Sequence, residues 1–116
     1  MSNQLELHLG KNATEISINI ITEINSINIT WEYAKKGHKG YEGHGGISSF
    51  PLSDLNGFET RKYYEHFIHP DSEMCELHLN FSNYHIILKY GKASFDKFEE
   101  HKKIVRETVK YRNFKN

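Results

Sequence analysis

Eight histidines are the residues of this sequence best suited to binding a transition metal. Zinc takes three or four nitrogen, sulfur or oxygen ligands in a tetrahedron. His66 and His69 could supply two of them, with Cys75 or His44 as a third. However, no Cys-x-x-Cys or His-Glu-x-x-His motif is present to complete such a site. We therefore predict no bound metal and no cofactor, and a metal- or small-ligand-binding protein stays an alternative function. The histidines are His8, His38, His44, His66, His69, His78, His85 and His101.

The segment from Lys35 to Gly46 contains five of the eight glycines. A glycine-rich backbone can hold a phosphate with its N–H groups, but such a loop normally leads into a helix, and here residues typical of a strand follow. We therefore predict a mobile loop between strands. If this loop has a function, ordering on a partner is the mode that its glycines favour. Its candidate binding residues are Lys35, Lys36, Lys39 and Tyr41.

The segment from Arg61 to Phe67 interleaves basic and aromatic side chains. Tyrosine and arginine dominate the binding energy of many interfaces because they combine a large contact area with polar tips. We predict a protein-binding surface made by Arg61, Lys62, Tyr63, Tyr64 and Phe67. Two alternatives remain: the rings pack beneath the sheet edge, or they stack on the bases of single-stranded nucleic acid. The chain has 15 basic and 15 acidic side chains, and this neutrality disfavours nucleic acid.

Catalytic chemistry finds little support in the sequence. Cys75 is the one cysteine, so an intrachain disulfide is excluded. It alternates in phase with Leu77 and Leu79, which predicts a buried and inert thiol. Nothing in the local sequence activates a serine, histidine or carboxylate as a nucleophile or base. We therefore predict a protein that is not an enzyme.

The positions of these residues depend on a series of short strands followed by one helix. Alternating apolar residues predict a strand at Leu5 to Leu9, two strands between Glu15 and Tyr33 with a turn near residues 23–26, and strands at 47–50 and 57–61. A hairpin of residues 75–81 and 84–90 leads into a helix with Phe95, Phe98, Val105 and Val109 on one stripe. We expect a single helical turn at residues 51–55. Residues 62–73 could be either a strand end or a helical turn. The expected fold is α+β: an antiparallel, partly open β-barrel or curved sheet of about six or seven strands, capped by the helix, in a single domain of residues 1–116.

Between residues 47 and 109 the expected order is a strand, a Pro-Leu-Ser-x-Leu turn at 51–55, a strand, a variable loop, a hairpin and a helix with Phe95 and Phe98 on its apolar face. This run resembles the small bacterial modules of the pleckstrin-homology-like (PH-like) fold. The resemblance implies a curved barrel plugged at one end by the helix, and binding of peptides, partner proteins or membranes. The glycine-rich and aromatic segments described above depart from the pattern. The clustered Lys and Arg of phosphoinositide-binding members are absent, so lipid binding is not implied.

Taken together, these features predict a small binding or regulatory module that acts by protein–protein contact. The exposed edge of such a sheet also permits a homodimer. No run approaches the length of a membrane span, and the first residues lack the character of a signal peptide, so we expect a cytoplasmic protein. The abundance of Ile, Asn, Lys and Tyr is typical of AT-rich bacterial or phage genomes, in which small inhibitors of defence nucleases or toxins are common. We include such an inhibitor among the expected functions.

Overall fold

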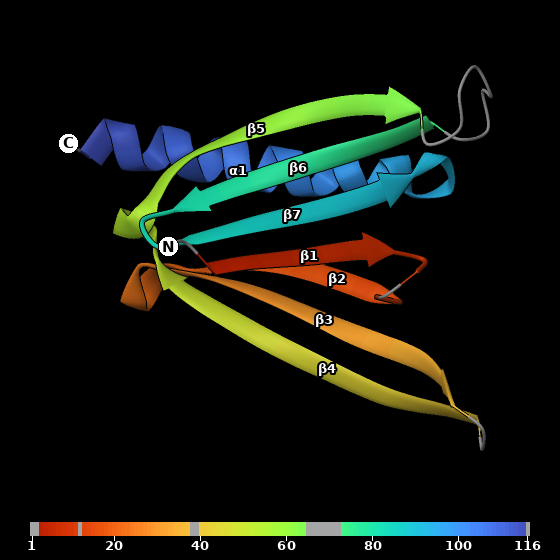
Figure 1. The fold of residues 1–116 in the computed structure, drawn as a ribbon. Coiled ribbons are helices and arrows are strands. Elements are labelled where there is room, and N and C mark those ends of the chain that lie inside the picture. The colour runs from red at the N-terminus through yellow and green to blue at the C-terminus, as the bar shows by residue number, and fades with distance from the viewer. Residues whose placement is uncertain (1–2, 12, 38–39, 65–72, 116) are drawn as a thin grey trace.

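Seven strands and one C-terminal helix make up the α+β fold in the computed structural model (Figure 1). The structure describes the backbone of residues 3–11, 13–37, 40–64 and 73–115, and the side chains of residues 4–11, 13–32, 46–64 and 73–110. The strands form two curved sheets that do not close into a barrel. The elements are β1 (Asn3–Leu9), β2 (Glu15–Ile21), β3 (Ser26–Gly37), β4 (Gly40–Pro51), β5 (Leu55–Tyr64), β6 (Glu73–Phe81), β7 (Tyr84–Gly91) and α1 (Phe95–Lys115).

The first sheet has the order β1-β7-β6-β5. Its centre is the predicted hairpin, in which Leu77 pairs with Leu88. Strand β5 is longer than the predicted strand at 57–61, and it takes up Lys62 to Tyr64 from the segment that the sequence left ambiguous. One pairing departs from the expected antiparallel arrangement, because β1 lies parallel to β7. The two strands are far apart in sequence, so no tight turn dictates their relative direction.

The second sheet has the order β2-β3-β4. The predicted turn between β2 and β3 is confirmed, with a short helical turn at residues 22–24. The predicted loop over Lys35 to Gly46 is wrong for the described backbone, since β3 continues to Gly37 and β4 begins at Gly40. Pairs such as Lys35 with Glu42 extend along this hairpin. A glycine lacks Cβ but keeps its backbone donor and acceptor, and it can therefore take part in such a ladder.

Helix α1 packs against β6, β7, β2 and β5. The predicted stripe is confirmed, as Phe98 and Val105 are buried and Phe95, Ile104 and Val109 pack against the core. The core joins this stripe to the inward-facing residues of both sheets. Among the described residues, no helix combines the length and the apolar character required to cross a membrane. The fully buried side chains are Leu7, Ile27, Ile29, Leu55, Leu77, Leu79, Ile86, Leu88, Tyr90 and Val105.

Candidate functional site

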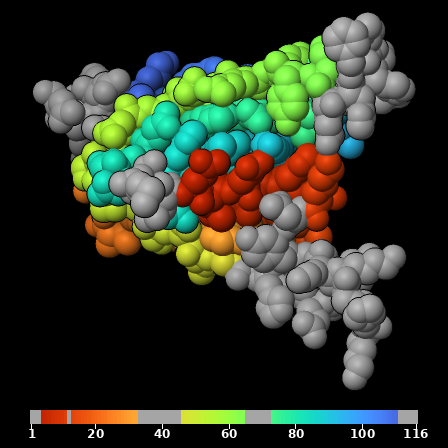
Figure 2. Space-filling view, in the orientation of Figure 1, coloured from red at the N-terminus to blue at the C-terminus, as the bar shows by residue number. Residues whose placement is uncertain are grey.

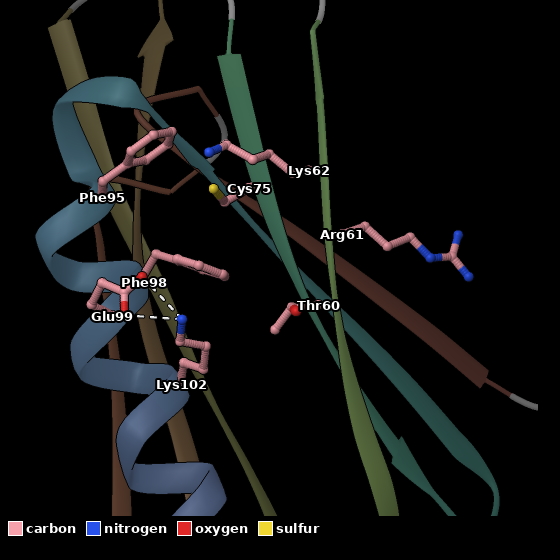
Figure 3. A pocket seen from close by; sticks show the side chains of 8 residues that line it. All are labelled: Thr60, Arg61, Lys62, Cys75, Phe95, Phe98, Glu99 and Lys102. Carbon is pink, nitrogen blue, oxygen red and sulfur yellow. Dashed lines mark hydrogen bonds and ion pairs between the residues drawn. The ribbon is translucent and has the colours of Figure 1, made fainter.

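A pocket of about 290 Å³ lies between strand β5 and the first two turns of α1 (Figure 3). We call this region the β5–α1 groove. Strand β5 is the last strand of its sheet, so within the described chain its outer edge pairs with no other strand. The groove is thus bounded by a free strand edge on one side and a helix on the other. Its lining residues are Thr60, Arg61, Lys62, Cys75, Phe95, Phe98, Glu99 and Lys102.

Strand alternation decides which β5 side chains reach the groove. Lys62 pairs with the inward-facing Cys75, whereas Arg61 pairs with Glu76 on the opposite face of the sheet. Figure 3 accordingly shows Lys62 directed toward the helix and Arg61 directed away from it, so Arg61 lines the pocket through its main chain. Arg61 instead lies 3.7 Å from Glu59 in an exposed ion pair.

Aromatic rings and ammonium groups meet inside the groove. Lys62 Nζ lies 6.0 Å from the centroid of the Phe95 ring, and Lys102 Nζ lies 5.0 Å from that of Phe98. Lys102 also lies 2.9 Å from Glu99 Oε2. The surface therefore offers apolar ring faces next to positive charge, which suits an apolar side chain accompanied by an acidic group.

Lys62 keeps its charge in this position. Its ammonium group lies 2.5 Å from Glu73 Oε1. This hydrogen bond, together with the charge of Glu73, raises the pKa of Lys62 above its ordinary value of 10.5. The ion pair is exposed on the lysine side, and exposed pairs contribute little to stability.

Cys75 lies at the bottom of the groove and is 5% exposed. Burial raises the pKa of its thiol, which keeps it protonated and weakly nucleophilic. Among the described residues that line the pocket there is no histidine to act as its base. The predicted buried position of this thiol is confirmed.

The structure places the predicted binding residues on different surfaces. Tyr63 is half-buried on β5, and Tyr64 at the strand end is 55% exposed. Residues Lys35, Lys36 and Tyr41 belong to the β3–β4 hairpin, and only their backbone is described. Figure 1 shows β4 and β5 at opposite margins of the molecule, so the two predicted binding segments do not form one surface. Lys39 and Phe67 lie outside the described residues.

The helix residues of the groove were not among the predicted binding residues. Phe95 and Phe98 were identified only as members of the apolar stripe. Lys102 follows Phe98 by four residues and therefore lies on the same side of the helix, which was the available signal. What the sequence could not show is that residues 60–62 of β5 lie beside this turn and bound a pocket together with it.

Two of the candidate zinc ligands, His66 and His69, lie outside the described residues. The described residues contain no group of three or more His, Cys, Asp or Glu side chains arranged to hold a metal ion. Three of the four described histidine side chains lie in two separate surroundings. His101 is buried against Tyr90, and His78 contacts His85 on the other face of the sheet.

Comparison with known proteins yields no relative. No protein-family model matches the chain, and no curated protein and no solved structure matches it significantly. The resemblance to PH-like modules therefore stays a prediction, and the functional argument must come from the geometry of the chain itself.

Proposed function

We propose that this protein is a small binding module that takes up an extended segment of a partner protein in the β5–α1 groove. The observation that carries the proposal is the pocket between the free edge of β5 and the rings of α1. An extended peptide can add to such an edge as a further strand. Main-chain hydrogen bonds then supply affinity, and the neighbouring pocket selects the side chains.

The lining of the groove suggests the chemistry of the segment. Phe95 is partly exposed in the groove and Phe98 lies buried behind it, and burial of one large apolar side chain at this position contributes about 1.5–3 kcal/mol. Lys62 and Lys102 place positive charge beside these rings. We therefore expect a segment with one aliphatic or aromatic anchor flanked by Asp or Glu. Tyr64, exposed at the end of β5, extends the same surface.

The alternative functions have weaker support. An enzyme needs an activated group, and the pocket offers a protonated thiol without a base. A binder of single-stranded nucleic acid is favoured by an excess of positive charge, whereas the chain carries 15 basic and 15 acidic side chains. We retain the PH-like assignment and the role as an inhibitor of a nuclease or toxin as parts of the proposal, because a small peptide-binding module is compatible with both.

The proposal can be tested by selecting peptides of about 12 residues from a random linear library, a length sufficient to span one strand. Binding of a selected peptide is then measured for the wild type and for two charge-reversed variants. Lys102→Glu alters the groove, and Lys103→Glu alters the neighbouring exposed position outside it. We expect the first to weaken binding at least tenfold and the second less than twofold. Amide chemical shifts should change in β5 and in the first turns of α1.

Equal losses of peptide affinity in the two variants would indicate general attraction between charges and would contradict specific binding in the groove. Shift changes confined to the β3–β4 hairpin would move the binding surface to Lys35, Lys36 and Tyr41, as the sequence predicted. Self-association that Lys102→Glu abolishes would assign the groove to a second copy of the chain. Melting temperatures of both variants must match the wild type for the comparison to hold.

A further inference from the structure

Two histidine rings meet on the face of the first sheet that lies opposite α1. Figure 2 shows this face, on which β5, β6, β7 and β1 lie side by side. His78 belongs to β6 and His85 to β7, and the strand register makes them diagonal neighbours, since His85 pairs with Asn80. Nδ1 of His78 lies 3.0 Å from Nε2 of His85. Neighbouring strands of one hairpin therefore hold two metal-binding nitrogens together.

A carboxylate fixes the orientation of the more buried ring. Nε2 of His78 lies 2.9 Å from Glu76 Oε1. A carboxylate only accepts hydrogen bonds, so Nε2 carries the proton and Nδ1 directs a lone pair toward His85. Histidines that bind metals have this arrangement, in which the second ring nitrogen donates to a carboxylate.

The Glu76 carboxylate also lies close to a lysine on the neighbouring strand β7. Glu76 Oε2 lies 3.7 Å from Lys89 Nζ, and Lys89 also forms an ion pair with Glu6. Lys89 thus helps to hold the Glu76 carboxylate beside His78. Glu76 and Lys89 therefore form an outer shell that orients the His78 ring.

The identity of the ion follows from the type of ligand. The 3.0 Å separation is that of an N–H···N hydrogen bond, so an ion that binds in its place requires both rings to turn until their lone pairs converge on it. Imidazole nitrogen suits copper, nickel and zinc, and among these divalent ions copper(II) has the highest affinity for nitrogen ligands.

We propose that His78 and His85 form a two-histidine site for a divalent transition-metal ion, copper(II) foremost. Water takes the remaining positions, because the described chain brings no third His, Cys, Asp or Glu ligand to the pair. Binding requires His85 to carry its proton on Nδ1, so that both nitrogens at the contact offer lone pairs. This is an exchange of tautomers and releases no net proton. The site is independent of the β5–α1 groove.

The test uses the full chain without a histidine tag, titrated with copper(II) at neutral pH. We expect one strongly bound ion per chain, with the hyperfine pattern of two imidazole nitrogens in its electron paramagnetic resonance spectrum. His85→Asn, at a half-buried position, should weaken binding at least tenfold and remove one nitrogen from the pattern. His8→Asn, on β1 of the same sheet face, is the matched control and should change affinity less than twofold.

Glu76→Gln provides a second test that leaves both ligands in place. Loss of the carboxylate should weaken copper(II) binding by about tenfold, as expected for an outer-shell partner. Failure of the wild type to bind copper(II) at millimolar concentration would overturn the proposal. An unchanged affinity and spectrum in His85→Asn would do so as well, because the ion would then be bound elsewhere in the chain.

Discussion

The Tyr90 hydroxyl lies 2.6 Å from His101 Nδ1 and links β7 to α1 inside the core. Both side chains are buried, and their rings meet edge-on. Burial raises the pKa of Tyr90 and lowers the pKa of His101, so the hydroxyl stays protonated and the imidazole neutral. Tyr90 therefore donates and Nδ1 accepts. This polar contact fixes the helix over the sheet that forms the other wall of the β5–α1 groove.

Removal of the hydroxyl tests this link. Tyr90→Phe keeps the ring but leaves Nδ1 of His101 buried without its donor, and we expect the free energy of unfolding to fall by about 1–2 kcal/mol. Urea denaturation at neutral pH measures the change. Tyr64→Phe, at a residue that is 55% exposed, should change it by less than about 0.5 kcal/mol. Equal stabilities of the two variants would mean that the contact contributes nothing.

Acid should weaken the same link. Burial lowers the pKa of His101 below its ordinary value of 6.5, while nearby Glu100 and Lys97 act in opposite directions. Between the lowered pKa and 6.5 the unfolded chain binds a proton that the folded chain does not, so stability falls as the pH falls through this window. Above pH 6.5 the contribution is fully present. Urea denaturation between about pH 7.5 and about pH 5 should show the free energy of unfolding decrease as the pH falls. In His101→Phe this decrease should be smaller. Identical pH profiles would exclude His101 as the cause.

The indole ring of Trp31 on β3 lies against Gly46 on β4 and leaves no room for a side chain there. A Cβ at Gly46 would come within 2.7 Å of Trp31 Cε2 and 2.9 Å of Cη2. Gly46→Ala should therefore lower the free energy of unfolding by about 1–3 kcal/mol, since the indole must move out of its packing. At Gly57 an added Cβ meets no atom within 4 Å, and Gly57→Ala is the matched control. Thermal unfolding of both variants measures the difference in stability. In a double variant that combines Gly46→Ala with Trp31→Leu, the smaller side chain at position 31 should remove the clash.

The thiol of Cys75 reports on the groove. Its burial and raised pKa predict labelling by a disulfide reagent at least tenfold slower than in urea-unfolded protein. A peptide bound in the β5–α1 groove should slow labelling further, because Cys75 lies at its base. Absorbance of the released thiolate measures both rates. Rapid labelling of the folded chain would contradict the buried position, and a rate insensitive to the peptide would place the peptide elsewhere.

Much of the local structure could be predicted because it depends on short-range periodicity. Alternation from Cys75 to Tyr90 predicted the hairpin, and the spacing of Phe98 and Val105 predicted the buried stripe of α1. The same helical spacing places His101 on this stripe, although the sequence analysis did not select it. The candidate groove could not be predicted in this way, since its two walls are separated by β6 and β7 along the chain.

The glycine-rich segment shows the limit of composition. Five glycines between Lys35 and Gly46 indicated a loop, yet the described backbone there forms the β3–β4 hairpin. Strand pairing uses backbone groups that every non-proline residue carries, so a partner strand in register can outweigh a low intrinsic preference for strand.

By itself, the sequence determined which stretches are strands or helix and which face of each is apolar, because side-chain period is a property of neighbouring residues. Only the tertiary structure decided that β1 pairs in parallel with β7, that β5 ends as a free edge beside Phe95, and that His78 meets His85. These relationships depend on which distant segments pack together. Many pairings satisfy the same local pattern, and the packing of the whole chain selects one of them.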